Sequence, residues 1–176
     1  MFVKTQIEVN APIDAVWAVV AHDFFGADKW AASLDLSQAR TDVGPGPSGS
    51  GLVSNGRACA TTLGDVSETI THYDEAAKTL SYSAVAPSMP FFVKGLKNTW
   101  TLTPKGKGKT TVGTNIEVAL MRIIGDMMSP MMKMQMGKLM RETMEELKFY
   151  IEEGKPHPRK VRAIQKAKQK GLKKAA

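Results

Sequence analysis

The segment SPMMKMQMGKLMRETMEELKFYIEEG, residues 129–154, carries the strongest helical pattern in the sequence. Ser129 is a suitable N-cap, Pro130 suits a first helical turn, and Gly154 suits the position just after a helix. The segment therefore predicts one long helix, from Pro130 to Glu153.

One face of this helix is apolar. Five apolar residues recur at spacings of four, four, three and four: Met136, Met140, Met144, Leu147 and Ile151. We expect this face to meet the rest of the domain. Met131 and Met134 fall off the stripe. Flexible thioethers suit a changeable apolar ligand as well as a core, so both roles stay open for the stripe.

Before this helix, short segments of alternating apolar and polar residues are separated by turn signals. The first, Phe2–Val9, has the period of two that is typical of a half-buried strand. Six further strands are predicted over residues 33–40, 56–63, 66–73, 79–86, 98–104 and 110–121. Two short helices are predicted after the first strand, one within residues 10–24 and one over Phe24–Trp30.

This order predicts an α+β fold. The short connections favour a seven-stranded, curved antiparallel sheet wrapped around the long C-terminal helix. Because a curved sheet and a straight helix cannot touch everywhere, we expect a gap between them.

Composition agrees with one folded domain. The 176 residues are 43% hydrophobic and 23% charged, and no apolar run is long enough to span a bilayer. The N-terminal residues lack the pattern of a signal peptide. The single cysteine, Cys59, has no partner for a disulfide or a zinc site. We expect a soluble, cytoplasmic protein.

The net charge of +7 is concentrated at one end of the chain. From Lys155 onward there are nine Lys or Arg and no acid, which leaves fifteen bases against seventeen acids in residues 1–154. We therefore expect a domain over residues 1–154 and a basic tail over Lys155–Ala176, separated from the helix by Pro156 and Pro158. The tail is either a solvated, mobile extension or a weak contact with anionic membrane. Because the domain has no basic excess, no nucleic acid partner is expected.

Sequence motifs for a bound cofactor are missing. Gly44–Gly49, GPGPSG, has the spacing of a dinucleotide fingerprint, but its prolines remove backbone N–H donors and no helix follows. The three histidines share no metal-ligand spacing, and no Ser-His-Asp context occurs. We expect no cofactor, no metal and no catalytic triad.

Several segments resemble one known superfamily. They are VNAPIDAVWAVVAHDF, GRACATTL, VSETITHYDEAAKTLSYS and LKNTWTLTPKGKGKTTV. Together they are similar to the START-like or Bet v 1-like proteins (SRPBCC), which include polyketide cyclase/dehydrase and lipid-transport proteins. The resemblance covers residues 2–153. It implies a helix-grip fold around an apolar cavity that binds a hydrophobic small molecule, such as a lipid, a sterol or a polyketide-like compound.

Alternation along residues 97–102 places Asn98 and Trp100 on the inner face of their strand. With the expected cavity, this gives seven candidate ligand-binding residues: Trp30, Tyr82, Asn98, Trp100, Met136, Met140 and Met144. Any of them could equally be plain core.

No catalytic residue is assigned, but Glu68 and Arg57 are candidates. Glu68 shares a strand face with Ile70, so its carboxylate is either an interior general base or a solvated strand residue. Arg57 either binds a ligand carboxylate or lies exposed at a strand start. In aromatase/cyclase members an arginine typically lies in the strand that corresponds to residues 66–73, and this sequence has none there. The leading interpretation is therefore a non-catalytic carrier or sensor. The alternatives are a cyclase/dehydrase-type enzyme and a module that acts through the basic tail.

Overall fold

The computed structural model describes residues 1–61 and 64–175, with side chains to residue 169. It contains one seven-stranded sheet in the order β1-β7-β6-β5-β4-β3-β2, and every neighbouring pair is antiparallel. The strands are β1 Phe2–Val9, β2 Leu34–Ala39, β3 Gly56–Thr61, β4 Gly64–Asp74, β5 Thr79–Val85, β6 Val93–Pro104 and β7 Thr110–Leu120. The predicted fold class is confirmed. The end of the third predicted strand, residues 62–63, lies outside the described residues.

Three short helical segments follow β1, where two were predicted. They are α1 Ile13–Trp17, the π-helical η1 Ala18–His22 and the 3₁₀-helical η2 Phe24–Lys29. The first two are continuous and correspond to the first predicted helix. Gly26 interrupts η2 with a non-helical backbone. The segment carries Phe24 and Ala27 into the core at 2% and 4% exposure.

The long helix α2 spans Ile124–Glu153 and begins six residues earlier than predicted. Ser129 is not its N-cap, and Pro130 lies inside the helix. The chain enters α2 through Ile123, whose φ of 70° makes a tight turn after β7. Pro130 is the seventh residue of α2, so its missing N–H leaves the carbonyl of Asp126 without the usual helical partner. The predicted end is correct: Gly154 has a φ of 65° and its N–H donates to the carbonyl of Tyr150 at 3.0 Å.

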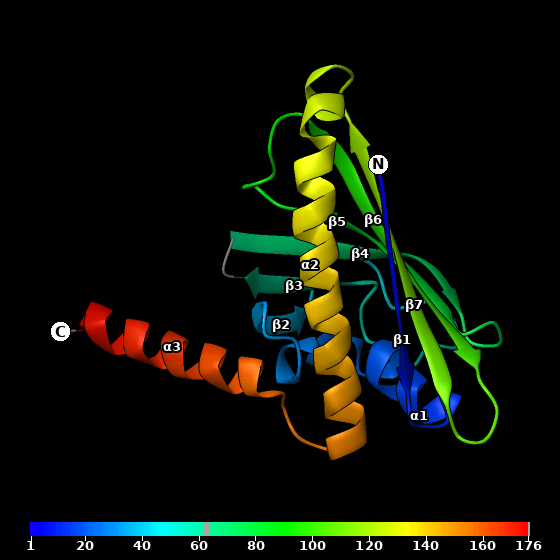
Figure 1. Ribbon diagram of the computed structural model, residues 1–176. Coiled ribbons are helices and arrows are strands. Elements are labelled where there is room, and N and C mark those ends of the chain that lie inside the picture. Colours follow the sequence, from blue (N-terminus) through cyan, green and yellow to red (C-terminus); the bar gives the residue numbers. More distant parts are fainter. Residues whose placement is uncertain (62–63, 176) are drawn as a thin grey trace.

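Figure 1 shows α2 lying across the concave side of the sheet, along β1 and β7, while β3 and β4 cross behind it. Three residues of the predicted stripe, Met140, Met144 and Leu147, are between 0% and 7% exposed. Met136 and Ile151 are partly buried and pack against the same core. The stripe therefore packs into the core between α2 and the sheet. Trp17 from α1 belongs to the same core.

The basic tail forms a helix, α3, over Pro158–Ala175. Its first turn is fixed: Arg159 Nε donates to Glu146 Oε1 at 2.8 Å, and Lys160 Nζ donates to the carbonyl of Leu34 at 2.5 Å. Beyond this turn α3 projects away from the domain (Figure 1). The mobility and the separate role of the tail stay predictions. No helix in the described ranges is long and apolar enough to cross a membrane.

Candidate functional site

A cavity of about 130 Å³ lies between α2, the sheet and the short helical segments after β1. Its wall is mostly apolar or aromatic, with a few polar side chains. The lining residues are Val19, Val20, Phe24, Ala27, Trp30, Ala31, Ser33, Leu34, Arg57, Glu68, Leu80, Tyr82, Asn98, Trp100, Leu139, Met140 and Thr143. Leu139, at 42% exposure, is the most exposed residue of this wall.

Seven of the nine candidate residues meet at this cavity: Trp30, Arg57, Glu68, Tyr82, Asn98, Trp100 and Met140. Met136 and Met144 lie outside its wall, contrary to the prediction. All three methionines share one face of α2, but only the helix segment between Leu139 and Thr143 borders the cavity. Met144 is 1% exposed and belongs to the closed core one turn further on.

Arg57 and Glu68 form a buried ion pair across β3 and β4. The two residues are direct partners in the strand register, and Arg57 Nε donates to Glu68 Oε2 at 2.5 Å. Their side chains are 8% and 12% exposed. The exposed alternatives for both residues are therefore wrong: the strand register places the two side chains opposite each other on the inner face.

Phe24 completes the surroundings of Arg57. Its carbonyl accepts a hydrogen bond of 2.5 Å from Arg57 Nη1, and its ring lies 4.1 Å below the guanidinium carbon. Burial alone would lower the pKa of Arg57, but the charge of Glu68 outweighs it and holds the pKa above its usual range. The guanidinium therefore keeps its charge in the interior.

Tyr82 on β5 is hydrogen-bonded to two side chains of β6. Its hydroxyl oxygen accepts hydrogen bonds from Asn98 Nδ2 at 3.0 Å and from Trp100 Nε1 at 3.4 Å. Asn98 is the direct register partner of Tyr82, which explains their contact. Burial raises the pKa of Tyr82 to about 12. The hydroxyl is therefore protonated at neutral pH, and its own hydrogen has no acceptor among the described residues.

Two further polar atoms at the cavity lack a hydrogen-bond partner among the described residues. They are Trp30 Nε1 and Asn98 Oδ1. Trp30 is 5% exposed and Asn98 is 4% exposed. Buried polar groups are normally paired, and an unpaired one costs about 1–3 kcal/mol. Both atoms belong to residues of the cavity wall, but neighbouring protein atoms cover them fully.

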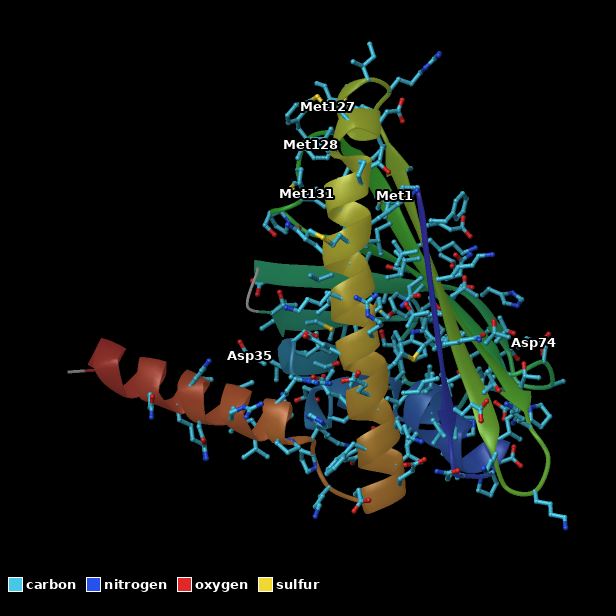
Figure 2. The ribbon with its side chains drawn as sticks, in the orientation of Figure 1. Met1, Asp35, Asp74, Met127, Met128 and Met131 are labelled. Carbon is cyan, nitrogen blue, oxygen red and sulfur yellow. The ribbon has the colours of Figure 1, made fainter. Side chains whose placement is uncertain are left out.

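The remaining methionines are not part of this site. Figure 2 shows Met127, Met128 and Met131 together at the N-terminal end of α2. Met127 and Met131 are 74% and 44% exposed, and neither lines the cavity. The methionine-rich segment therefore divides into an exposed end, a closed core and one cavity residue, Met140.

Several residues of the wall were not predicted from the sequence. Phe24 supplies both a carbonyl and a ring to Arg57, yet it lies 33 positions away in a helix with a broken pattern. Leu139 and Thr143 lie beside the predicted stripe on α2 rather than on it. The two residues are one helical turn apart, and Met140 lies between them in the sequence. A wider helix face, drawn to include the neighbours of Met140, would have contained both.

Solved structures with the same fold are numerous but distant in sequence. A START superfamily protein from Mycobacterium smegmatis is 14% identical, with a TM-score of 0.63 and coverage of 86% of this chain and 97% of that chain. A norcoclaurine synthase mutant from Thalictrum flavum is 13% identical, with a TM-score of 0.66 and coverage of 88% and 95%. The di-domain ARO/CYC protein BexL is 16% identical, with a TM-score of 0.68 and coverage of 86% of this chain and 46% of that chain. These similarities show the fold. Among curated proteins, none matches significantly.

A family model matches most of the sequence. The match covers residues 2–152, which include the whole sheet and nearly all of α2. Its description is polyketide cyclase/dehydrase and lipid transport. The helix-grip architecture agrees with this match, and so does the internal cavity that the sheet and α2 enclose. The chain is a member of the polyketide cyclase/dehydrase and lipid transport family, within the START-like superfamily, and its domain is a ligand-binding domain.

Proposed function

We propose that this protein binds a hydrophobic small molecule in the cavity beside Met140, without covalent chemistry, as a carrier or sensor. The main support is the cavity itself, whose lining side chains are mostly aromatic or aliphatic. Burial of apolar surface contributes about 25 cal/mol per Å², so such a wall favours an apolar guest.

The size of the cavity limits the guest. Pockets for drug-sized ligands have volumes of about 300–1,000 Å³, whereas this one has about 130 Å³. An apolar cavity of roughly 150 Å³ in another protein holds one benzene molecule. The enclosed part of the ligand is therefore a single ring or a short chain. A whole lipid or sterol fits only if its remainder extends outside the cavity.

The charges of the wall also favour binding over chemistry. Glu68 Oε2 accepts from Arg57 Nε, and Phe24 holds the same guanidinium through its carbonyl. Because Glu68 Oε2 and the Arg57 guanidinium are already bonded to each other, either group must leave this pair before the same atoms can act on a ligand. The pair is thus suited to hold β3, β4 and η2 together around the cavity.

The test is ligand-detected NMR with toluene as the probe. Ala31 is 2% exposed and lines the cavity, so Ala31→Leu fills part of the space and should abolish toluene binding. Ala32→Leu is the matched control, because Ala32 is only partly buried and does not line the cavity. If toluene binds the Ala31→Leu protein as well as the unmodified protein, the cavity is not the binding site. Native mass spectrometry of freshly purified protein then identifies any natural ligand that copurifies.

A second candidate function is catalysis of the cyclase/dehydrase type. The observation in its favour is that Glu68 and Arg57 both line the cavity, next to the neutral hydroxyl of Tyr82. A carboxylate, a guanidinium and a phenol can move a proton and stabilise a ligand oxygen in one pocket. Loss of turnover with retained binding in a Glu68→Gln protein would support this function.

We also propose that α3 holds the protein weakly on an anionic membrane at the cytoplasmic side. Helix α3 carries eight Lys or Arg and no acid over Pro158–Ala175. Val161 and Ile164 are 43% and 39% exposed, which gives a thin apolar stripe without an aromatic anchor. Each basic residue near an anionic surface contributes about 1 kcal/mol. Attachment of this kind is reversible and mostly electrostatic.

A further inference from the structure

The first turn of α3 is tied to a segment that forms part of the cavity wall. This segment, Trp30–Leu34, runs from the end of η2 to the first residue of β2. It supplies four residues of the wall: Trp30, Ala31, Ser33 and Leu34. The carbonyl of Leu34 accepts a hydrogen bond of 2.5 Å from Lys160 Nζ, which comes from α3. Lys160 is 3% exposed, so little water competes for this bond. The start of α3 therefore holds one side of the cavity.

Glu146 on α2 joins the same segment to α3. Its Oε2 accepts from the backbone N–H of Ala32 at 2.8 Å, and its Oε1 accepts from Arg159 Nε at 2.8 Å. Arg159 Nη2 also binds α2, through the carbonyl of Glu142. Glu146 is 3% exposed, so these donors stand in for the water that a carboxylate otherwise needs. We call Glu146, Arg159 and Lys160 the clasp.

The clasp holds the wall at the edge of the sheet. β5 and β6 lie in the middle of the sheet, with a hydrogen-bonded strand on both sides, whereas β2 is an edge strand that pairs only with β3. Of the wall residues that are not buried, four belong to the two segments that the clasp joins: Ser33, Leu34, Leu139 and Thr143. Movement here breaks no strand pair in the middle of the sheet, so it costs less than movement of β5 or β6.

Resting on the function proposed above, we propose that the segment Trp30–Leu34 is the gate of the cavity and that the clasp keeps this gate closed. Opening moves the segment away from α2 and lets the ligand pass between them. The bonds from Ala32 to Glu146 and from Lys160 to Leu34 must then break together. Hydrogen bonds to charged groups are among the stronger ones in proteins. The closed state is therefore favoured, and the ligand exchanges slowly.

Two alternatives make different demands. If the clasp only fastens α3 to the domain, its loss lowers the stability and leaves the rate of ligand exchange unchanged. If the ligand enters at another part of the wall, such as that formed by Val19 and Glu68, which are also not fully buried, the clasp has no effect on the rate either. Rates of exchange separate both alternatives from a gate.

The experiment measures the association and dissociation rates of toluene by NMR exchange spectroscopy on the full chain. The clasp variant is Arg159→Gln/Lys160→Met, which keeps two long side chains and removes both charges. We expect both rates to rise at least about tenfold, because the gate opens more often. The affinity should change less than about threefold, since Arg159 and Lys160 do not line the cavity. Lys160→Met alone should give a smaller rise of both rates.

Two further variants are controls. Arg162→Gln/Lys166→Met makes the same change of charge at exposed residues of α3 that form no hydrogen bond or ion pair in the described part of the chain. Val112→Ala lowers the stability at a core residue of 0% exposure outside the cavity wall. Both should exchange toluene at the rate of the unmodified protein. A tenfold rise in the first would show that net charge sets the rate, and a tenfold rise in the second that global stability does. Either result would overturn the gate.

Amide hydrogen exchange tests the gate in the absence of any ligand. The N–H of Ala32 should lose protection at least about tenfold in the clasp variant, while that of Trp100 in β6 keeps its protection. Unchanged rates of toluene exchange in the clasp variant would overturn the gate and leave the cavity function standing. If toluene does not bind even the unmodified protein, the proposed function fails, and unchanged protection of Ala32 would then overturn the gate as well.

Discussion

Arg57 Nε lies 2.5 Å from Glu68 Oε2, and the two residues face each other directly across β3 and β4. Both side chains are nearly buried, at 8% and 12% exposure. Removing two charges from water is costly, and their attraction repays this cost only when the geometry is good. The pair therefore couples the stability of the domain to the shape of its cavity.

Removal of one partner should be much worse than removal of both. We expect Arg57→Met to lower the free energy of unfolding by about 3–5 kcal/mol, because Glu68 then remains buried without its counter-ion. The double variant Arg57→Met/Glu68→Leu should recover most of this loss. Urea denaturation of the single and double variants measures the coupling. Simple additivity of the two single losses would show that the charges do not interact.

The carrier and enzyme interpretations differ at Glu68. Glu68→Gln keeps the size of the side chain and one acceptor for Arg57, so toluene affinity should stay within about tenfold of the unmodified protein. Apolar burial, which the substitution leaves intact, dominates such binding. The measurement is an NMR titration of both proteins. If a turnover assay on a polyketide-like substrate succeeds and Glu68→Gln abolishes it while binding survives, the carrier interpretation is wrong.

Met140 and Met136 should differ although both lie on one face of α2. Met140 lines the cavity, so Met140→Ala should enlarge it and let naphthalene bind about tenfold more tightly than to the unmodified protein. Met136→Ala is the matched control and should leave naphthalene affinity unchanged, because Met136 lies outside the wall. Equal gains in the two variants would mean that the helix shifts as a whole. NMR titration of both proteins decides.

Much of the fold follows from local sequence patterns. β1 has the predicted bounds, because its alternation continues over all eight residues. The start of β6 was predicted five residues late, at Asn98, since Gly95 and the residues around it do not alternate cleanly. The start of α2 was also predicted late, because Ser129 and Pro130 imitate an N-terminal cap. Local signals thus identify the elements better than their ends.

The candidate site depends on contacts between distant segments. Alternation correctly predicted that Asn98 and Trp100 are buried, since it needs only one strand. The burial of Arg57 depends on Glu68, on the strand register and on the carbonyl of Phe24, which no local pattern contains. The unpaired atoms of Trp30 and Asn98 can be recognised only when every neighbour is in place.

Acid should weaken the contact between α1 and the β4–β5 turn through Glu75. Its carboxylate accepts from Trp17 Nε1 at 2.7 Å and from Tyr73, and it pairs with Lys78 at 2.9 Å. Partial burial by itself raises the pKa of Glu75, but these hydrogen bonds outweigh it and hold the pKa well below the usual value of 4.5. The unfolded chain therefore binds this proton more readily than the folded one.

The stabilisation by Glu75 is thus fully present above pH about 4.5 and is lost as the pH falls below it. Glu75→Gln should be less stable than the unmodified protein at pH 7, and the difference should shrink toward pH 3. Urea denaturation across this range measures it. Glu153→Gln, at an exposed carboxylate of α2, is the control and should keep the full acid dependence. An unchanged acid dependence in Glu75→Gln would contradict the assignment.

Helix α3 should bind anionic membranes through the part that projects from the domain. The test must spare the first turn, because Arg159 pairs with Glu146, which is only 3% exposed, and Lys160 binds the carbonyl of Leu34. A chain that ends at Ala163 keeps these contacts and loses five lysines from the projecting part of the helix. We expect the full chain to sediment with anionic vesicles, and the binding to weaken steeply as salt rises. The shortened chain should stay in the supernatant.

Thermal unfolding of the shortened chain provides the control. Its melting temperature should match that of the full chain, since the contacts of Arg159 and Lys160 remain. Equal binding of the full chain to neutral vesicles would contradict an electrostatic contact through α3. That result would assign the contact to the exposed apolar end of α2, where Ile123 and Met127 are 83% and 74% exposed. Met127→Ser would then reduce binding, whereas an α3 contact predicts that Met127→Ser leaves it unchanged, because a basic helix without an aromatic anchor binds by charge alone.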